Sequence, residues 1–308
     1  MSTSPKKSAA YLSVVAAISL AAIKLLIGLA TGSLAVLASA VDSLLDILMS
    51  SINFFAIQRA EQPADECHPF GHGKYETLAA FIQALIIAAS GLWIIFESIR
   101  RLFGEIELRR IDTGIAVLAF SAVCSWLIAR HLRKVARATD SPALETDSLH
   151  FAMDVYTNLA LLIGLVVVNV FNVPQLDPIL SLGVALYILF EALQLVRRSL
   201  NDVLDAELPK EHREHIEQLL NEHRADIINY HNLRTRQAGS QKIMDFHLTV
   251  CRHLTVEQAH DIADQLEQKI EKDILGADVT IHMEPCKRED CPGRDVCIPE
   301  RMKNHQAL

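Results

Sequence analysis

The chain has 308 residues, of which 51% are hydrophobic and 21% charged, with a formal net charge of −8 and a mean hydropathy of +0.23. This is too apolar for an ordinary soluble protein, and the acidic balance argues against a nucleic-acid binder. The six scattered cysteines do not form the framework of a secreted disulfide-rich domain. The length fits a membrane domain (1–205), a soluble domain (206–285) and a cysteine-containing tail (286–308).

Six apolar segments in the first 200 residues can each cross a bilayer, which takes about 20 residues of helix. Lys and Arg are more frequent at the span ends on the side of the N-terminus, so both termini are predicted to be cytoplasmic. The predicted spans are Ala9–Ala30, Leu34–Ile57, Leu78–Ile99, Thr113–Leu132, Leu149–Phe171 and Pro178–Val196.

The second and fifth spans each carry a pair of ionisable residues, and such residues are costly in a bilayer and usually functional. Asp42 and Asp46 lie four residues apart in the second span, and His150 and Asp154 in the fifth. Each pair therefore shares one helical face. If the faces meet, three carboxylates and one imidazole suit tetrahedral Zn²⁺, whereas octahedral Mg²⁺ favours oxygen ligands and water. Such groups also bind protons when the metal leaves, which predicts metal–proton exchange.

The alternative is that these residues are solvated at span ends or cap neighbouring helices. Asp147 and Ser148, at the start of the fifth predicted span, fit that role. Two other polar residues have structural interpretations. Lys24 is expected to reach the interface or pair inside the protein, and Gln83 to hydrogen-bond between helices.

The loop after the second span, PADECHPFGHGKYE, is rich in ligand-type residues among prolines and glycines. Asp65, His68 and His72 are predicted to form a three-ligand metal site with an open position. Cys67 is a further candidate whose side-chain direction the sequence does not give. The alternative is a solvated polar loop.

The soluble part predicts a small α+β domain with the order helix-strand-strand-helix-strand. Its first helix follows Pro209, and a turn at Ala238-Gly239-Ser240 joins two strands. Lys242–Val250 alternates between apolar and polar residues, and the last strand is DVTIHME. The second helix, from about Thr255 to Lys272, has a predicted buried stripe of Val256, Ala259, Ile262, Ala263, Leu266 and Ile270. His247, His282 and Glu284 lie on the strand faces that point away from the core.

Several motifs together resemble one family, the cation diffusion facilitators, and most closely their bacterial zinc and ferrous-iron efflux branch. They are DSLLD in the second span, HPFGHGK in the loop, DSLHFAMD in the fifth span, HNLRTRQAGSQ in the soluble part and VTIHMEP near its end. The resemblance covers nearly the whole chain. It implies six membrane helices followed by a ferredoxin-like cytoplasmic domain, assembled as a homodimer that exchanges metal for protons across the bacterial cytoplasmic membrane.

The resemblance also implies roles for particular residues. The transport site matches Asp42, Asp46, His150 and Asp154, and the loop site matches Asp65, His68 and His72. An ionic interlock between protomers matches Lys74 and Asp205. A cytoplasmic metal cluster matches His231, His247, His260, His282 and Glu284, although relatives more often carry Asp at the last position. His150, where manganese-type relatives tend to carry Asp, favours Zn²⁺ or Cd²⁺.

The sequence thus predicts a divalent-metal exporter and not an enzyme. Zn²⁺ is favoured, with Cd²⁺, Fe²⁺ and Co²⁺ as open alternatives. A non-transporting metal sensor needs no buried membrane site, and an intramembrane metalloprotease would need HExxH or an equivalent glutamate in a span. The C-x4-C-x5-C spacing of Cys286, Cys291 and Cys297 is no standard zinc pattern, which leaves metal binding, redox chemistry and disorder open for the tail.

Overall fold

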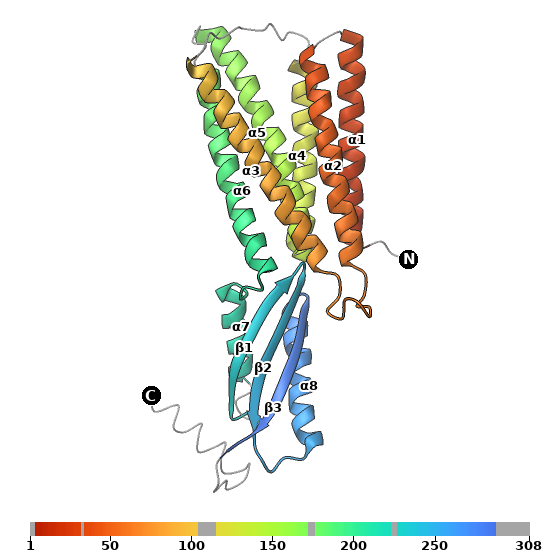
Figure 1. Ribbon diagram of the computed structural model, residues 1–308, viewed down its shortest axis with the longest axis vertical. Helices are drawn as coiled ribbons and strands as arrows, with labels where there is room; N and C mark the ends of the chain where they lie inside the picture. Colours follow the sequence, from red (N-terminus) through yellow and green to blue (C-terminus); the bar gives the residue numbers. More distant parts are fainter. Residues whose placement is uncertain (1–3, 32–33, 104–114, 172–175, 223–226, 288–308) are drawn as a thin grey trace. The chain divides into compact units, whose positions relative to one another are not determined.

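The computed structural model describes residues 4–31, 34–103, 115–171, 176–222 and 227–287. The chain divides into two compact units, Met1–Val203 and Leu204–Leu308. The first unit is built of long helices and the second of a small sheet with helices (Figure 1). Some side chains within the described helices, that of Asp42 among them, lie outside the described set.

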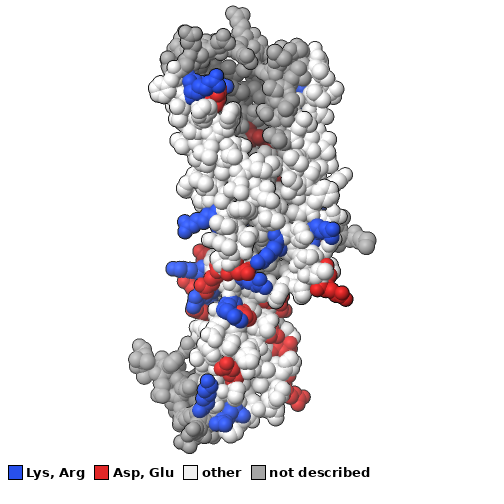
Figure 2. Space-filling model, in the orientation of Figure 1, with Lys and Arg blue, Asp and Glu red and all other residues white. Residues whose placement is uncertain are grey.

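Helices form at all six predicted spans. By length and composition, Pro5–Ile27, Lys74–Phe103 and Pro178–Val203 each qualify as a membrane span among the described residues. Uncharged side chains cover most of the helical surface visible in Figure 2, as contact with hydrocarbon requires. The helices are α1 (Pro5–Thr31), α2 (Leu34–Ala60), α3 (Lys74–Phe103), α4 (Ile115–Thr139), α5 (Pro142–Phe171) and α6 (Leu176–Val203).

Three helix pairs have the most extensive contacts: α1 with α2, α4 with α5, and α3 with α6. Further contacts join α1 to α4 and α2 to α5, while α3 also lies against α2 and α5. Small side chains allow close approach, because Ala9, Ala10, Ala129 and Ala136 are buried in the cluster that α1, α4 and α5 share. The contact between α2 and α5 joins the two helices that carry the predicted intramembrane ligands.

The fifth helix begins earlier than its apolar run predicts. It starts at Pro142, and the hydroxyl of Ser141 accepts a hydrogen bond from the backbone N–H of Leu144 at 3.3 Å. Asp147 and Ser148 therefore do not cap this helix, and both are buried. A membrane helix continues past its apolar run where neighbouring helices satisfy its polar side chains.

The second unit is a three-stranded sheet in the order β1-β2-β3. Strand β1 pairs antiparallel with β2, and β2 pairs parallel with β3 through the crossover helix α8. The predicted helix-strand-strand-helix-strand order is confirmed. The elements are α7 (Lys210–Glu222), β1 (Asn229–Ala238), β2 (Gln241–Val250), α8 (Val256–Asp273) and β3 (Ala277–Pro285).

The core of this unit lies between one face of the sheet and the two helices. The apolar residues of β2 are buried, as their alternation predicts, and α8 buries Ala259, Ala263, Leu266 and Ile270. The prediction is wrong for Val256, which is 83% exposed. Val256 is the first residue of α8, and the buried stripe meets the core only from the next turn onward. The opposite face of the sheet carries the histidines.

Candidate metal centres

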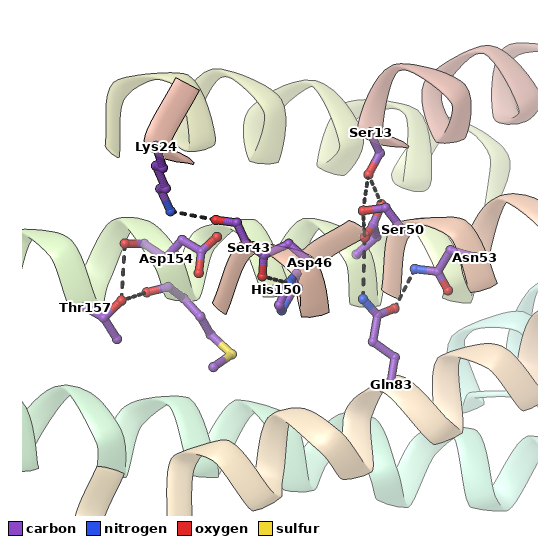
Figure 3. A network of polar contacts seen from close by, with 12 residues as sticks. Ser13, Lys24, Ser43, Asp46, Ser50, Asn53, Gln83, His150, Asp154 and Thr157 are labelled. Atoms are coloured by element: carbon purple, nitrogen blue, oxygen red, sulfur yellow. Dashed lines mark hydrogen bonds and ion pairs between the residues drawn. The ribbon is translucent and has the colours of Figure 1, made fainter. Parts of the chain in front are cut away.

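The first candidate metal site lies between α2 and α5 (Figure 3). Asp46 projects from α2, and His150 and Asp154 project from successive turns of α5. Nε2 of His150 lies 3.0 Å from Oδ1 of Asp46, and one ligand atom from each of the three residues lies within 4.8 Å of the other two. Tetrahedral zinc ligands stand about 3.4 Å apart, so a small inward movement would close this set. Asp42, one turn before Asp46, has a side chain outside the described set.

Lys24 of α1 lies beside this site and is buried. Its Nζ donates a hydrogen bond to the hydroxyl of Ser43 on α2 at 2.9 Å. Of the two alternatives that the sequence left open, the structure shows the internal pairing, and Lys24 does not extend toward lipid. This ammonium belongs to the polar wall of the site.

A second buried polar group adjoins the site, centred on Asp147 of α5, three residues before the ligand histidine. The Asp147 carboxylate accepts hydrogen bonds from Ser13 of α1 at 2.5 Å, and from Ser50 of α2 and Gln83 of α3 at 3.4 Å. Gln83 in turn accepts a bond from Asn53 of α2 at 2.5 Å. All five residues are at most 2% exposed. We call them the Asp147 network; it joins four helices.

The sequence predicted only one member of this network, because Gln83 was expected to bond between helices and does. It missed the central role of Asp147. The available signal was its spacing, since a residue three positions before a ligand histidine lies on nearly the same helical face.

The second candidate metal site is the loop between α2 and α3. The rings of His68 and His72 have centroids 4.5 Å apart. Nδ1 of His68 lies 3.3 Å from Oδ1 of Asp65. Nε2 of His72 lies 3.3 Å from Oδ2 of the same aspartate. All three residues offer ligand atoms within 4.8 Å of one another. The structure therefore brings together the three residues that the sequence singled out.

The loop backbone holds this site in place. The Asp65 carboxylate accepts hydrogen bonds from the backbone N–H groups of His68, at 2.7 Å, and Cys67, at 2.9 Å. The bond from His68 is the largest influence on the pKa of Asp65, which lies below its usual value. Nδ1 of His72 lies 3.2 Å from the carbonyl oxygen of Pro63, which orients its ring. Cys67 is exposed and does not belong to the ligand group.

The third candidate metal site lies on the outer face of the sheet in the second unit. Cross-strand register places His231 opposite His247 and His247 opposite His282. Nδ1 of His247 lies 2.9 Å from Oε1 of Glu284, and Nε2 of His231 lies 3.5 Å from its Oε2. The hydrogen bond from His247 lowers the pKa of Glu284, which favours the ionised, metal-binding form.

Not every predicted member joins this group within one protomer. His231, His247 and Glu284 offer ligand atoms within 4.8 Å of one another. His282 is exposed, and its ring lies against that of His247 with the centroids 4.8 Å apart. His260 is exposed on α8 and lies outside the three-residue group. The structure thus assembles part of the predicted cluster.

The two residues of the predicted interlock lie in different units. Within the second unit, the carboxylate of Asp205 accepts hydrogen bonds from Arg236 at 3.3 Å and 3.4 Å. Lys74 begins α3 and is exposed. Their pairing across a dimer stays a prediction.

The arrangement defines a class of protein: a helical membrane protein with a metal-type ligand set inside its helices and further sets outside them. The model of the cation efflux transmembrane domain matches residues 10–204, and that of the cation efflux protein cytoplasmic domain matches residues 208–286. The chain belongs to the cation efflux, or cation diffusion facilitator, family. It is therefore a cation efflux transporter of the membrane and not an enzyme.

Individual relatives agree with this assignment. The cation-efflux pump FieF of Salmonella paratyphi A is 36% identical over 272 residues, covering 88% of this chain and 90% of the relative. FieF of Salmonella newport is 36% identical over 264 residues, covering 86% and 87%. A solved structure of CzrB in its zinc form is 38% identical over 27% of this chain and 96% of that chain, with a TM-score of 0.26.

Proposed function

We propose that the chain exports Zn²⁺ in exchange for protons, as a homodimer in the bacterial cytoplasmic membrane with both termini in the cytoplasm. One observation carries this proposal: Asp46, His150 and Asp154 converge from two helices on a point inside the membrane domain. Ionisable residues in such a place mark ion pathways. Asp42, one turn before Asp46, completes the proposed tetrad.

The donor set supports zinc. One imidazole and three carboxylates supply the mixed nitrogen and oxygen ligands of tetrahedral Zn²⁺, whereas Mg²⁺ demands octahedral oxygen coordination. Cd²⁺, Fe²⁺ and Co²⁺ are accepted by similar ligands, so we expect them as weaker or competing substrates.

Proton exchange follows from the same ligands. Metal binding requires deprotonated carboxylates and a neutral imidazole, so the loaded site has released its protons. The empty site takes up protons in return. A site of this composition that opens alternately to the two sides therefore carries metal one way and protons the other.

The outer sites fit supporting roles. We propose that Asp65, His68 and His72 bind a second ion near the ends of α2 and α3, and that the cluster around His247 binds metal in the cytoplasm. The full cluster would include His260 and His282, and Lys74 would pair with Asp205 as the dimer interlock. The match to a cytoplasmic domain typical of cation efflux proteins supports this assignment.

Metal uptake into inside-out vesicles tests the transport site. With an imposed pH gradient, the wild-type chain is expected to accumulate Zn²⁺, and the Asp154→Ala variant is not. Collapse of the gradient should reduce wild-type uptake. Unchanged uptake by the variant would refute the tetrad, and indifference to the gradient would refute proton exchange.

Glu97→Gln serves as the matched control. Glu97 is an acidic residue of the membrane helix α3, but it bonds Arg101 at 3.0 Å on the helix surface. Its loss should leave uptake unchanged. A competition series with Cd²⁺, Fe²⁺ and Co²⁺ then ranks the metals.

A further inference from the structure

A groove of about 450 Å³ opens between α4 and α5, apart from the three metal centres. Every charged residue that lines it in the described part of the chain is a cation: Arg130, Arg133, Lys134 and Arg137. These four side chains are exposed, and none of them pairs with a carboxylate among the described residues. Like charges three or four positions apart on one helix repel each other, so the groove favours an anion.

The floor of the groove is apolar. Ala129 of α4 and Ala152 and Val155 of α5 are buried beneath it. The two alanines leave space where larger side chains would fill the gap between the helices. The groove therefore combines a hydrophobic bed with a cationic rim.

Trp126 precedes the four cations along α4 and lines the groove at the end farther from the C-terminus of this helix. It is half exposed, and the guanidinium of Arg130 lies 5.6 Å from the centre of its ring. This cation–π contact orients Arg130 along the groove. Tryptophan is typical of the level at which lipid headgroups meet acyl chains. Arg130, Arg133 and Arg137 follow within the next three turns, so the polarity rises along the groove from ring to cations.

We propose that this groove binds an anionic phospholipid, with its phosphate at the arginines and an acyl chain over Ala152 and Val155. Guanidinium groups bind phosphate oxygens in pairs, and basic pockets between membrane helices suit acidic headgroups. A soluble phosphate would use the cations but leave the apolar floor uncovered. The groove's two-part lining thus selects a lipid over a free anion.

Tryptophan fluorescence measures this binding directly. The chain has two tryptophans, so Trp93→Phe leaves Trp126 as the only reporter. The full-length protein is placed in phosphatidylcholine nanodiscs, and acyl-brominated phosphatidylglycerol is added stepwise. Bromine quenches nearby indoles, so we expect quenching that saturates at a low fraction of the acidic lipid. Brominated phosphatidylcholine should quench in linear proportion to its amount, without saturation.

The double variant Arg133→Gln/Arg137→Gln is expected to need roughly 30-fold more acidic lipid for half-maximal quenching. Arg133→Lys/Arg137→Lys keeps the charge and should retain most of the affinity. This second variant keeps the test valid if the first folds poorly. The matched control is Arg100→Gln/Arg101→Gln, since those arginines bond Glu97 at the end of α3, and it should change nothing.

Three outcomes would overturn the proposal. Equal quenching by both lipids would mean no preference for the anionic headgroup. An equal loss in the control pair would mean a general attraction to charged membranes. Displacement of the brominated lipid by inorganic phosphate would mean that the cations bind a soluble anion.

Discussion

The ligand sets in the two units are built in opposite ways. In the membrane unit, Asp46 comes from α2 and His150 from α5, two helices that do not follow each other in the chain. In the second unit, His231, His247 and Glu284 come from three strands hydrogen-bonded side by side. The first set can open or close when two helices shift, whereas the second is tied to one sheet. A site that must release its ion gains from the first construction, and one that must hold an ion gains from the second.

Loss of His150 from the proposed transport site should have the largest effect. His150→Ala removes the only imidazole of the set, and transport of Zn²⁺ should fall by at least about 100-fold, because even partners of metal ligands are worth 10- to 100-fold. Vesicle uptake measures the loss. His131→Ala, an exposed histidine of α4, is the matched control and should transport normally. Equal losses in both variants would mean that the loss of transport does not come from the proposed transport site.

Removal of the buried carboxylate that holds the membrane helices together should weaken the fold. Asp147→Ala leaves the hydroxyl of Ser50 and the amide of Gln83 without their carboxylate acceptor, and the free energy of unfolding should fall by about 2–3 kcal/mol. Unfolding by denaturant in mixed micelles gives this value. Glu97→Ala breaks only surface ion pairs, those with Arg100 and Arg101, and should cost under about 1 kcal/mol. Similar costs for the two variants would contradict the Asp147 network.

The cytoplasmic cluster should respond independently of transport. Glu284→Gln removes a carboxylate that contacts two histidines, and zinc affinity at this cluster should fall roughly 10- to 100-fold. Competition with a fluorescent chelator, in a His150→Ala background, measures this affinity in the full-length protein. Asp278→Asn is the control, an exposed carboxylate on the same strand. An unchanged affinity in Glu284→Gln would exclude this residue as a ligand.

The smallest effect concerns the helix behind the cytoplasmic sheet. Thr255 and Gln258 form a reciprocal capping box at the start of α8. Thr255→Ala should cost about 1 kcal/mol, which lowers the hydrogen-exchange protection of the first amides of α8 about fivefold. Thr249→Ala on β2 is the control and should leave these amides unchanged. Unchanged or slower exchange of these amides in Thr255→Ala would contradict the role of the cap.

Spacing along the sequence predicted a large part of both units. The i, i+4 pairs identified Asp46, His150 and Asp154, and strict alternation identified the buried face of β2. These patterns succeed because each depends on the geometry of one element. The density of His and Asp in the loop identified Asp65, His68 and His72 for the same local reason.

Contacts between elements were not predictable from the sequence. Spacing places Asp147 near the face of His150, but its hydrogen bonds come from Ser13 and Gln83 on other helices, and the sequence does not show which faces meet. Val256 fits the periodicity of α8 but lies before the part that reaches the core. The groove between α4 and α5 exists because two alanines from different helices lie together. In each case the deciding partner is distant in the chain.

The row formed by His231, His247 and His282 has one further consequence. Successive residues of a strand point to opposite faces, so slippage of β2 by one residue would bury the histidine and expose Phe246 and Leu248. The apolar core therefore enforces the same alignment that the ligands need. The domain therefore forms the geometry of the proposed cluster when it folds, and an ion that bound there would lose little affinity to ordering the sheet.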